Sequence, residues 1–365
     1  MARLGDYVKI KTGKLDANVS SNNGQYPFFT CSVEPLRIDT YSYDCECVLV
    51  AGNGDLNVKY YNGKFDAYQR TYIIESNNKT VLSVPYLYCF LDKYVEELRK
   101  QSIGGVIKYI KLGNLTEAQI PTCSIEEQKK IVSDFDKVND LISFRKQQLT
   151  KLDELVKSRF IEMFGSIEEN NNKFEIVNVE DVCSLIKDGT HQTPQYTEDS
   201  INGYKFLSSK DVMTQKIDWS NIKYIPAELH EKLYATIKPQ RNDLLMSKNG
   251  VNYGVAAVND TDEIFDIYVS LALMRPLDII EPYYFRCVLN SEQTKKQFDS
   301  SIKGIGVPNL HLGEIKKTKI ILPPIELQKE FVEFVKLIDK SKFEIQKSLE
   351  KLETLKKALM QKYFG

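Results

Sequence analysis

The sequence lacks any run of about 18 apolar residues, the length that a membrane-spanning helix requires. Its first residues, MARLGDYVKIKTGK, include basic side chains but no apolar core after them, which is unlike a signal peptide. The 365 residues have the composition of an ordinary soluble globular protein, with 42% hydrophobic and 27% charged residues. We therefore expect a cytoplasmic protein of two or three domains with no part in the membrane.

Patterns that bind metals are also scarce. The chain has three histidines, and its seven cysteines are scattered along the sequence. An odd number of cysteines in a chain that is not secreted indicates reduced thiols. Cys45 and Cys47 would share one side of a strand, but no second pair completes the four ligands of a zinc site. We therefore expect no bound metal.

Excess positive charge is missing as well. The formal net charge is −1 and the pI is about 6.4. This balance argues against a protein that binds nucleic acid strongly and without sequence preference when it acts alone.

An internal repeat is the clearest feature that is present. Residues 104–165 align with residues 304–365 at a constant offset of 200, without a gap. Sixteen of these 62 aligned pairs are identical, against about four expected by chance at average residue usage. The stretches IEEQKKIV from Ile125 and IELQKEFV from Ile325 begin the most similar part. A gapless match of this length indicates duplication of a structural unit.

The repeated unit has the spacing of a coiled-coil seam, alternately four and three residues. In the first copy the seam consists of Ile131, Phe135, Val138, Ile142, Arg145, Leu149, Leu152, Val156, Arg159 and Met163. In the second it consists of Phe331, Val335, Ile338, Lys342, Ile345, Leu349, Leu352, Lys356, Leu359 and Tyr363. Each copy predicts a helix of about 40 residues and about 60 Å. We expect the two helices to pack on each other because the seam runs their whole length; packing of each helix on its own domain is the alternative.

The chain therefore divides into globular part, helix, globular part, helix. The predicted boundaries are 1–123, 124–164, a polar linker at 165–173, 174–322 and 323–365. Short β-type runs fill both globular parts: ECVLVA, RTYIIE and VIKYIKL in the first, and YKFLSS, YVSLALM and KTKIILP in the second. Helical patterns at 85–100 and 282–298 occupy equivalent places. A second indication of the duplication is a predicted strand that enters an Asn-Gly turn. It occurs in VLVAGNGDLNV and again in DLLMSKNGVNYGVAAV.

This arrangement resembles the specificity subunit of type I restriction–modification enzymes over essentially the whole chain. The resemblance rests on the two proline-led helices, Pro121–Gly165 and Pro323–Gly365, and on several shorter phrases. The starts of the family's two target-recognition domains resemble LGDYVKIKTGK and VEDVCSLIKDGTHQTP. Later motifs of the family resemble GKFDAYQRTYII and GIGVPNLHLGEIKKTKIILPPIELQKEF. The implied fold is two α/β domains joined by two helices in an antiparallel coiled coil, with pseudo-two-fold symmetry.

The resemblance also implies a function. Each domain would read one half of a bipartite target in double-stranded DNA, and the helices would set the gap between the halves. The subunit would have no catalytic role and no cofactor of its own. It would recruit two methyltransferase subunits, which bind S-adenosylmethionine and methylate adenine, and translocase–nuclease subunits could join them.

Motifs of catalysis are absent from the sequence itself. The only Pro-Pro pair is Pro323-Pro324, so an amino-methyltransferase motif of the form Asn/Asp-Pro-Pro-aromatic is missing. Neither a G-x-x-x-x-G-K-[ST] phosphate loop nor H-E-x-x-H occurs. A hydrolase built on scattered acids and a coiled-coil adaptor for other proteins are the alternatives. The adaptor explains the helices but not two large divergent domains with polar loops.

Base-reading side chains are most often Arg, Lys, Asn, Gln, Ser or Thr on loops. In the first domain the candidates are Asn53, Asp55, Asn57, Lys59, Tyr68, Gln69 and Arg70, with Tyr68 a candidate for the core as well. In the second they are Lys187, Thr190, His191, Gln192, Ser208, Ser209, Lys210, Ser247, Lys248, Asn249 and Asn252. Lys303, Asn309 and His311 precede the second helix and are candidates for phosphate contact; a plain strand–turn–helix connection is the alternative.

Overall fold

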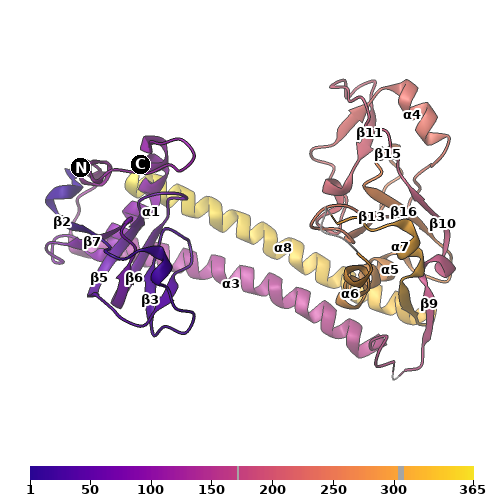
Figure 1. The fold of residues 1–365 in the computed structure, drawn as a ribbon, viewed down its shortest axis with the longest axis horizontal. Coiled ribbons are helices and arrows are strands. Elements are labelled where there is room, and N and C mark those ends of the chain that lie inside the picture. The colour runs from indigo at the N-terminus through magenta and orange to yellow at the C-terminus, as the bar shows by residue number, and fades with distance from the viewer. Residues whose placement is uncertain (171, 303–307) are drawn as a thin grey trace. The chain divides into compact units, whose positions relative to one another are not determined.

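The computed structural model describes residues 1–170, 172–302 and 308–365. The chain divides into two compact units, one of residues 1–148 with 345–365 and the other of residues 149–344. Two long helices, α3 (Ile125–Phe164) and α8 (Ile325–Phe364), each contribute one segment to each unit (Figure 1). Both predicted helices are thereby confirmed. The predicted domain boundaries, which set the helices apart from the globular parts, stay a prediction.

The first unit is built on a six-stranded sheet of order β2-β7-β5-β6-β3-β4. Its strands are β2 (Val8–Thr12), β3 (Tyr26–Phe29), β4 (Leu36–Ile38), β5 (Tyr43–Ala51), β6 (Val58–Ala67) and β7 (Thr71–Ser76). Helix α1 (Val84–Gln101) packs on β5 and β6 and buries Leu87 and Phe90. The remaining elements are β1 (Ala2–Arg3), β8 (Gln119–Ile120), α2 (Leu112–Thr116), and the 3-10 helices η1 (Leu4–Asp6) and η2 (Ala17–Val19).

This sheet curls back on itself. The end of β6 reaches the segment that follows β2, where the Leu15 amide donates to the Ala67 carbonyl at 3.4 Å. The Tyr43 hydroxyl at the start of β5 likewise donates to the Thr12 carbonyl at 3.1 Å. The curl brings loops from distant parts of the chain to the same end of the sheet.

The second unit repeats this plan with a longer chain. A four-stranded sheet has the order β10-β16-β13-β14, and a three-stranded sheet has the order β12-β11-β15. The strands are β9 (Glu175–Asn178), β10 (Cys183–Asp188), β11 (Tyr204–Leu207), β12 (Lys223–Ile225), β13 (Leu244–Ser247), β14 (Ala256–Val258), β15 (Phe265–Ile267), β16 (Leu271–Pro276) and β17 (Lys319–Leu322). The helices are η3 (Val179–Val182), η4 (Ser209–Val212), α4 (Ala227–Tyr234), α5 (Pro282–Leu289), α6 (Glu292–Ser301) and α7 (Leu312–Lys317).

Two local predictions are wrong. VIKYIKL is not a strand: residues 105–108 form a loop, and α2 begins at Leu112. The helical pattern at 282–298 is two helices, because Asn290 turns its side-chain amide to the backbone of Ala256, accepting from its nitrogen at 3.0 Å and donating to its oxygen at 2.9 Å. Ser291 then caps the N-terminus of α6 by accepting from the Thr294 amide.

The helices pair in opposite directions in each unit. In the first, Phe135 near the start of α3 stacks on Phe364 at the end of α8, with ring centroids 6.0 Å apart. In the second, Phe160 near the end of α3 meets Phe331 near the start of α8 at 5.6 Å. The predicted antiparallel pairing is thus confirmed. Basic seam residues have partners at the edge of the helix pair: Lys342 contacts Asp153, and Arg159 lies 3.5 Å from Glu330.

One buried glutamine in each copy of the repeat attaches the long helix to the neighbouring globular fold. Gln128 accepts from the Ser83 amide at 2.9 Å and donates to the Val81 carbonyl at 2.7 Å. Gln328 accepts from the Glu281 amide at 2.8 Å and donates to the carbonyls of Ile279 and Pro323 at 3.1 and 2.7 Å. These bonds fix the start of α1 or α5 against the start of a long helix. They give the shared glutamine of IEEQ and IELQ a structural role.

Candidate nucleic-acid interface

Three backbone segments of the first unit meet where the sheet curls. They are the Asn-Gly loop (residues 52–57), the Tyr turn (residues 68–70) and the stretch that leads into α2. The Gly52 amide donates to the Arg70 carbonyl at 2.8 Å, the Gly54 amide donates to the Lys108 carbonyl at 2.9 Å, and the Ile110 amide donates to the Gly52 carbonyl at 2.9 Å. Six of the seven candidates of the first domain therefore lie on connected backbone, and the seventh, Lys59, lies at the start of β6 directly after the Asn-Gly loop.

The second unit makes the same set of bonds with its own Asn-Gly loop (residues 248–252) and Tyr turn (residues 268–270). The Lys248 amide donates to the Ser270 carbonyl at 2.8 Å, and the Gly250 amide donates to the Pro308 carbonyl at 3.1 Å. Asn249 pairs with Asn309 in an isolated antiparallel bridge, as Asn53 pairs with Tyr109 in the first unit. The two loop clusters thus have one backbone design and different side chains.

Glycine is required at particular positions of these loops. A Cβ on Gly52 would lie 2.3 Å from the Arg70 carbonyl oxygen, which no real contact allows. Gly54 and Gly250 have positive φ angles of 69° and 88°. Residues other than glycine rarely adopt this backbone region. The glycines at these positions therefore serve the backbone conformation of the loops.

In the first unit the candidates differ in solvent exposure and in their hydrogen bonds. Asp55, Gln69 and Arg70 are exposed, while Asn53 and Tyr68 are half-buried. Asn57 is held inside its loop, because its amide donates to the carbonyls of Cys31 and Asp55 at 2.8 and 2.9 Å. The Lys59 ammonium donates to Asn57, and burial lowers the pKa of Lys59. Asn57 and Lys59 are therefore oriented as a pair at the base of the loop.

The exposed candidates of the second unit include Lys187, His191, Gln192, Asn249 and Asn252, and Thr190 is half-buried. Two others do not face solvent. Ser247 is 0% exposed, and its hydroxyl bonds the Asn252 carbonyl and the Val255 amide, so it holds the loop and has no free surface for a base. Lys248 is 4% exposed, with its ammonium 2.5 Å from Asp188. The prediction that Ser247 and Lys248 are accessible for contact with a base is wrong for this fold, because both side chains are buried.

The SSKD stretch lies beside the Tyr turn of the second unit. The Ser209 amide donates to the Ser270 hydroxyl at 3.0 Å, and Ser208 forms a capping box with Asp211 at the start of η4. The exposed Lys210 lies 2.6 Å from the buried Asp211. The stretch thus joins the loop cluster, although Asp211 offsets part of its charge.

The candidates for phosphate contact lie at the other side of the cluster. Asn309 is exposed beside Asn249, and His311 is the exposed N-cap residue of α7. Lys303 lies outside the described residues. A connection from strand to helix and a contact surface are both compatible with these positions.

Each unit also has a buried aspartate that is not among the candidates predicted from the sequence. Asp66 accepts from the Ser42 hydroxyl at 2.6 Å, and the equivalent Asp266 lies 2.7 Å from His230 Nδ1. Burial raises the pKa of Asp266, and the His230 ring stacks on Tyr204 with centroids 3.6 Å apart. Each aspartate sits two residues before the tyrosine of a Tyr turn. The same offset of 200 that aligns the helices also aligns the two aspartates and could have found them.

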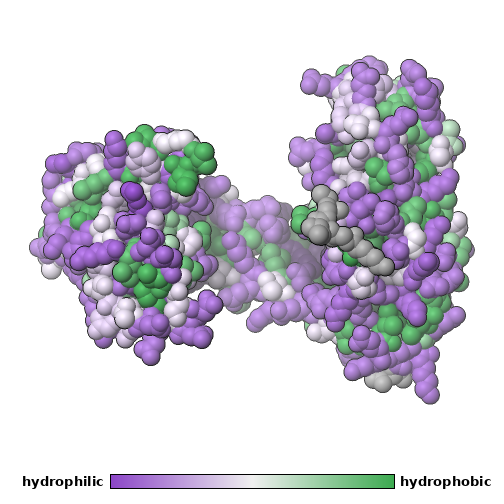
Figure 2. All heavy atoms as spheres, viewed as in Figure 1, coloured by the Kyte–Doolittle hydropathy of each residue, from purple (hydrophilic) through white to green (hydrophobic). Residues whose placement is uncertain are grey.

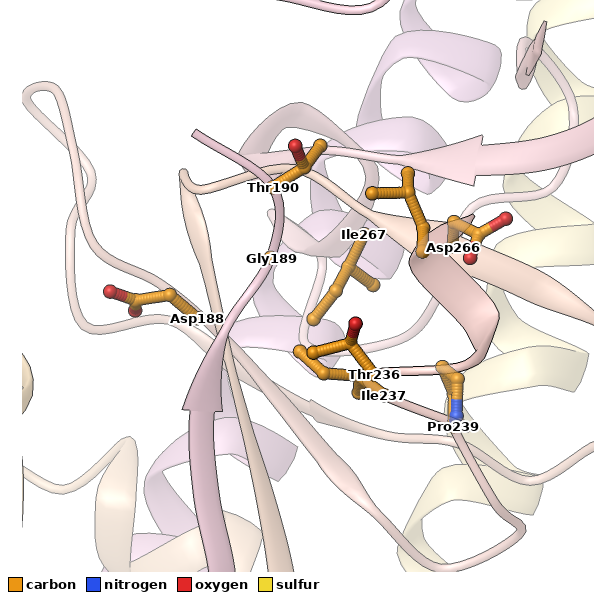
Figure 3. A pocket seen from close by; sticks show the side chains of 9 residues that line it. Asp188, Gly189, Thr190, Thr236, Ile237, Pro239, Asp266 and Ile267 are labelled. Atoms are coloured by element: carbon orange, nitrogen blue, oxygen red, sulfur yellow. The ribbon is translucent and has the colours of Figure 1, made fainter. Parts of the chain in front are cut away.

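A small cleft of about 110 Å³ lies behind the loop cluster of the second unit. It is lined by Asp188, Gly189, Thr190, Leu233, Thr236, Ile237, Pro239, Asp266 and Ile267. Figure 3 shows Thr236, Ile237 and Ile267 gathered together, with the Asp188 carboxylate directed away from them. Over the described residues, no group of three or more His, Cys, Asp or Glu side chains is placed to hold a metal ion. No helix in the same ranges is long and apolar enough to cross a membrane.

The fold and the loops together define a class of protein. One α/β fold occurs twice, and each copy is attached through a buried glutamine to a long helix. Each copy also presents polar loops that share their backbone hydrogen bonds and differ in their side chains. This is a protein built from a duplicated α/β fold and two paired long helices.

The comparisons identify the family. The model of the type I restriction modification DNA specificity domain matches residues 1–154 and 171–357, so the chain belongs to this family. The specificity subunit of the type I restriction enzyme EcoDI of Escherichia coli is 37% identical over 154 residues, which are 42% of this chain and 34% of that protein. The MjaVIII specificity subunit of Methanocaldococcus jannaschii is 26% identical over 394 residues, which cover 99% of this chain and 90% of that protein. The chain thus matches about a third of the first relative and most of the second.

Solved structures share the fold. The crystal structure of the S subunit of a type I restriction–modification system from M. genitalium has a TM-score of 0.58 at 17% identity, covering 100% of this chain and 95% of that one. A chain from a structure of the assembly of the type I R-M system has a TM-score of 0.59 at 16% identity and covers 100% and 96%. These likenesses confirm the predicted fold class.

Proposed function

We propose that this specificity subunit reads a bipartite target in double-stranded DNA, one half with each unit, and has no catalytic role itself. The observation that supports the proposal is the pair of loop clusters, equal in backbone hydrogen bonds and different in side chains. Base contacts need donors and acceptors in fixed positions, and a bonded loop supplies them. The long helices would then fix the spacer between the half-sites. Methyltransferase subunits carrying S-adenosylmethionine would modify adenine, and translocase–nuclease subunits would join when cleavage is required.

The deciding experiment is methylome sequencing of the host with and without the gene. We expect loss of one bipartite adenine-methylation motif on deletion and its return on complementation. Substitution of Gln69 and Arg70 by alanine should change or abolish one half of the motif only. An unchanged methylome on deletion would refute the proposal and favour the adaptor alternative.

The isolated chain should bind DNA weakly. Several basic side chains near the loops already have acidic partners, such as Lys248 with Asp188 and Lys210 with Asp211. The methyltransferase subunits would therefore supply much of the phosphate contact, which is the main source of affinity. A gel shift at fixed salt should show tight, site-specific binding only for the complex. Equal affinity and discrimination by the lone chain would contradict this expectation.

The helices offer a docking surface for those subunits. Leu141, Phe144 and Leu155 of α3 are exposed, as are Leu337 and Leu355 of α8. Leu337 and Leu355 are 18 residues apart, which is five turns of an α-helix, so they share one face. Leu155 and Leu355 are also equivalent in the repeat. Exposed apolar stripes of this kind are typical of protein contacts, and one stripe on each helix provides for two partners.

Changing one stripe should remove one partner. We expect the double variant Leu337→Ser with Leu355→Ser to bind one methyltransferase subunit where the unmodified chain binds two, as counted by native mass spectrometry. Lys357→Ser, an exposed position on a different face of α8, is the control and should still bind two. Retention of two subunits by the double variant would place docking elsewhere.

A further inference from the structure

The first unit carries a short turn, residues 103–109, with an apolar tip. Ile103 and Tyr109 close it with two backbone hydrogen bonds of 3.0 and 2.9 Å. Gly104 adopts a positive φ of 118°, and a Cβ there would lie 2.5 Å from the Ile107 carbonyl. At the tip, Val106 is 104% exposed and Ile107 is 63% exposed. Neither side chain contributes to a core, so folding does not explain them.

The tip stands among the predicted base-reading loops. Tyr109 pairs with Asn53 in an antiparallel bridge, and the Lys108 carbonyl accepts from the Gly54 amide at 2.9 Å. The lysines Lys108 and Lys111 beside it are exposed. Hydrophilic residues cover most of the face shown in Figure 2, and hydrophobic residues form small separate clusters. An apolar tip between basic side chains has the composition of a surface that meets bases while the lysines meet phosphates.

We propose that Val106 and Ile107 form a wedge that enters the base stack of the first half-site and opens one base step. The inference rests on the proposed function. Branched apolar side chains inserted in this way unstack bases, and burial of the two side chains offsets the cost of unstacking. The closed turn presents them without a further loss of backbone freedom. An opened base step lowers the free-energy cost of extruding the target adenine into a methyltransferase partner.

The position of the tip favours DNA over a protein partner. The turn is bonded to the Asn-Gly loop through Gly54 and Tyr109, so DNA in contact with Asn53 would pass close to the turn that carries Val106. The exposed apolar stripes on the helices belong to other elements. A methyltransferase contact at the tip is therefore the second outcome to be distinguished.

The experiment uses the complete methyltransferase complex and a duplex containing its mapped target, with 2-aminopurine placed in turn at each step of the first half-site. We expect a several-fold rise in 2-aminopurine fluorescence at one step on binding. The double variant Val106→Ser with Ile107→Ser should lose this rise and bind about tenfold more weakly, because two buried side chains are lost. Ile201→Ser, a site that is 91% exposed in the second unit, should keep both properties.

The outcomes separate the wedge from the function on which it rests. A complex that binds the mapped target with no fluorescence rise at any step overturns the wedge and leaves bipartite recognition intact. The wedge is also overturned if the double variant keeps the rise, or if it fails to assemble with methyltransferase subunits as judged by native mass spectrometry. A deletion strain with an unchanged methylome contradicts bipartite recognition itself.

Discussion

Replacing Gln328 by alanine should lower the free energy of unfolding of the second unit by at least about 3 kcal/mol. The Gln328 side chain makes three hydrogen bonds, to the Glu281 amide and to the carbonyls of Ile279 and Pro323, and it is 0% exposed. Alanine leaves one donor and two acceptors without partners in a place that is closed to water. Each unpaired buried group costs on the order of 1–3 kcal/mol, and the small cavity adds to that cost. Urea denaturation followed by circular dichroism measures the shift.

Matched variants show whether stability depends on the hydrogen bonds of Gln328 or only on having glutamine in the helix. Gln346→Ala removes an exposed glutamine from the same helix and should change stability by less than about 0.5 kcal/mol. Gln128→Ala removes the equivalent bonds in the first unit and should shift that unit's transition. A Gln328→Ala variant as stable as Gln346→Ala would show that water replaces the side chain, and that the glutamine does not attach the helix to its recognition fold.

The long helices and the duplication could be predicted because they depend on periodicity and on residues close in the sequence. The Asn-Gly turns were predictable for the same reason, and each lies between paired strands, β5 with β6 and β13 with β14. The stretch VIKYIKL shows the limit of this reasoning. Its β-branched residues favour a strand, but Gly104 and Gly105 allow a tight turn whose bonds to Gly52 and Gly54 satisfy the backbone instead.

The inner arrangement of the candidate site depends on contacts between distant segments. Lys248 is a typical surface residue in composition, yet Asp188, 60 positions earlier, is close enough to pair with it and keep it buried. Ser247 is likewise engaged by the backbone of Asn252 and Val255. Residue type alone pointed to loops that lie together in each unit, but not to which side chains within them are exposed. The base contacts assigned to the exposed candidates stay predictions.

Inserting one heptad into each long helix should lengthen the spacer of the methylated target by about three base pairs and leave both half-sites unchanged. Seven residues add about 10 Å to an α-helix, and base pairs are stacked about 3.4 Å apart. A heptad preserves the seam spacing of four and three, and matched insertions after Lys146 and Gln346 keep the antiparallel partners equal in length. Methylome sequencing of strains that carry the variant reads the new spacer directly.

Insertions of four residues at the same two places provide the contrast. Four residues add about 6 Å but move the seam by about 40° around the helix axis, because one turn contains 3.6 residues. Apolar seam residues such as Leu149 and Leu349 would then be displaced from the partner helix, so stability should fall while the heptad variant stays close to the parent. If the heptad variant methylated a target with the original spacer, the helices would not set that distance. A changed half-site would instead mean that the loops of Asn53 and Asn249 depend on the helices for more than their attachment.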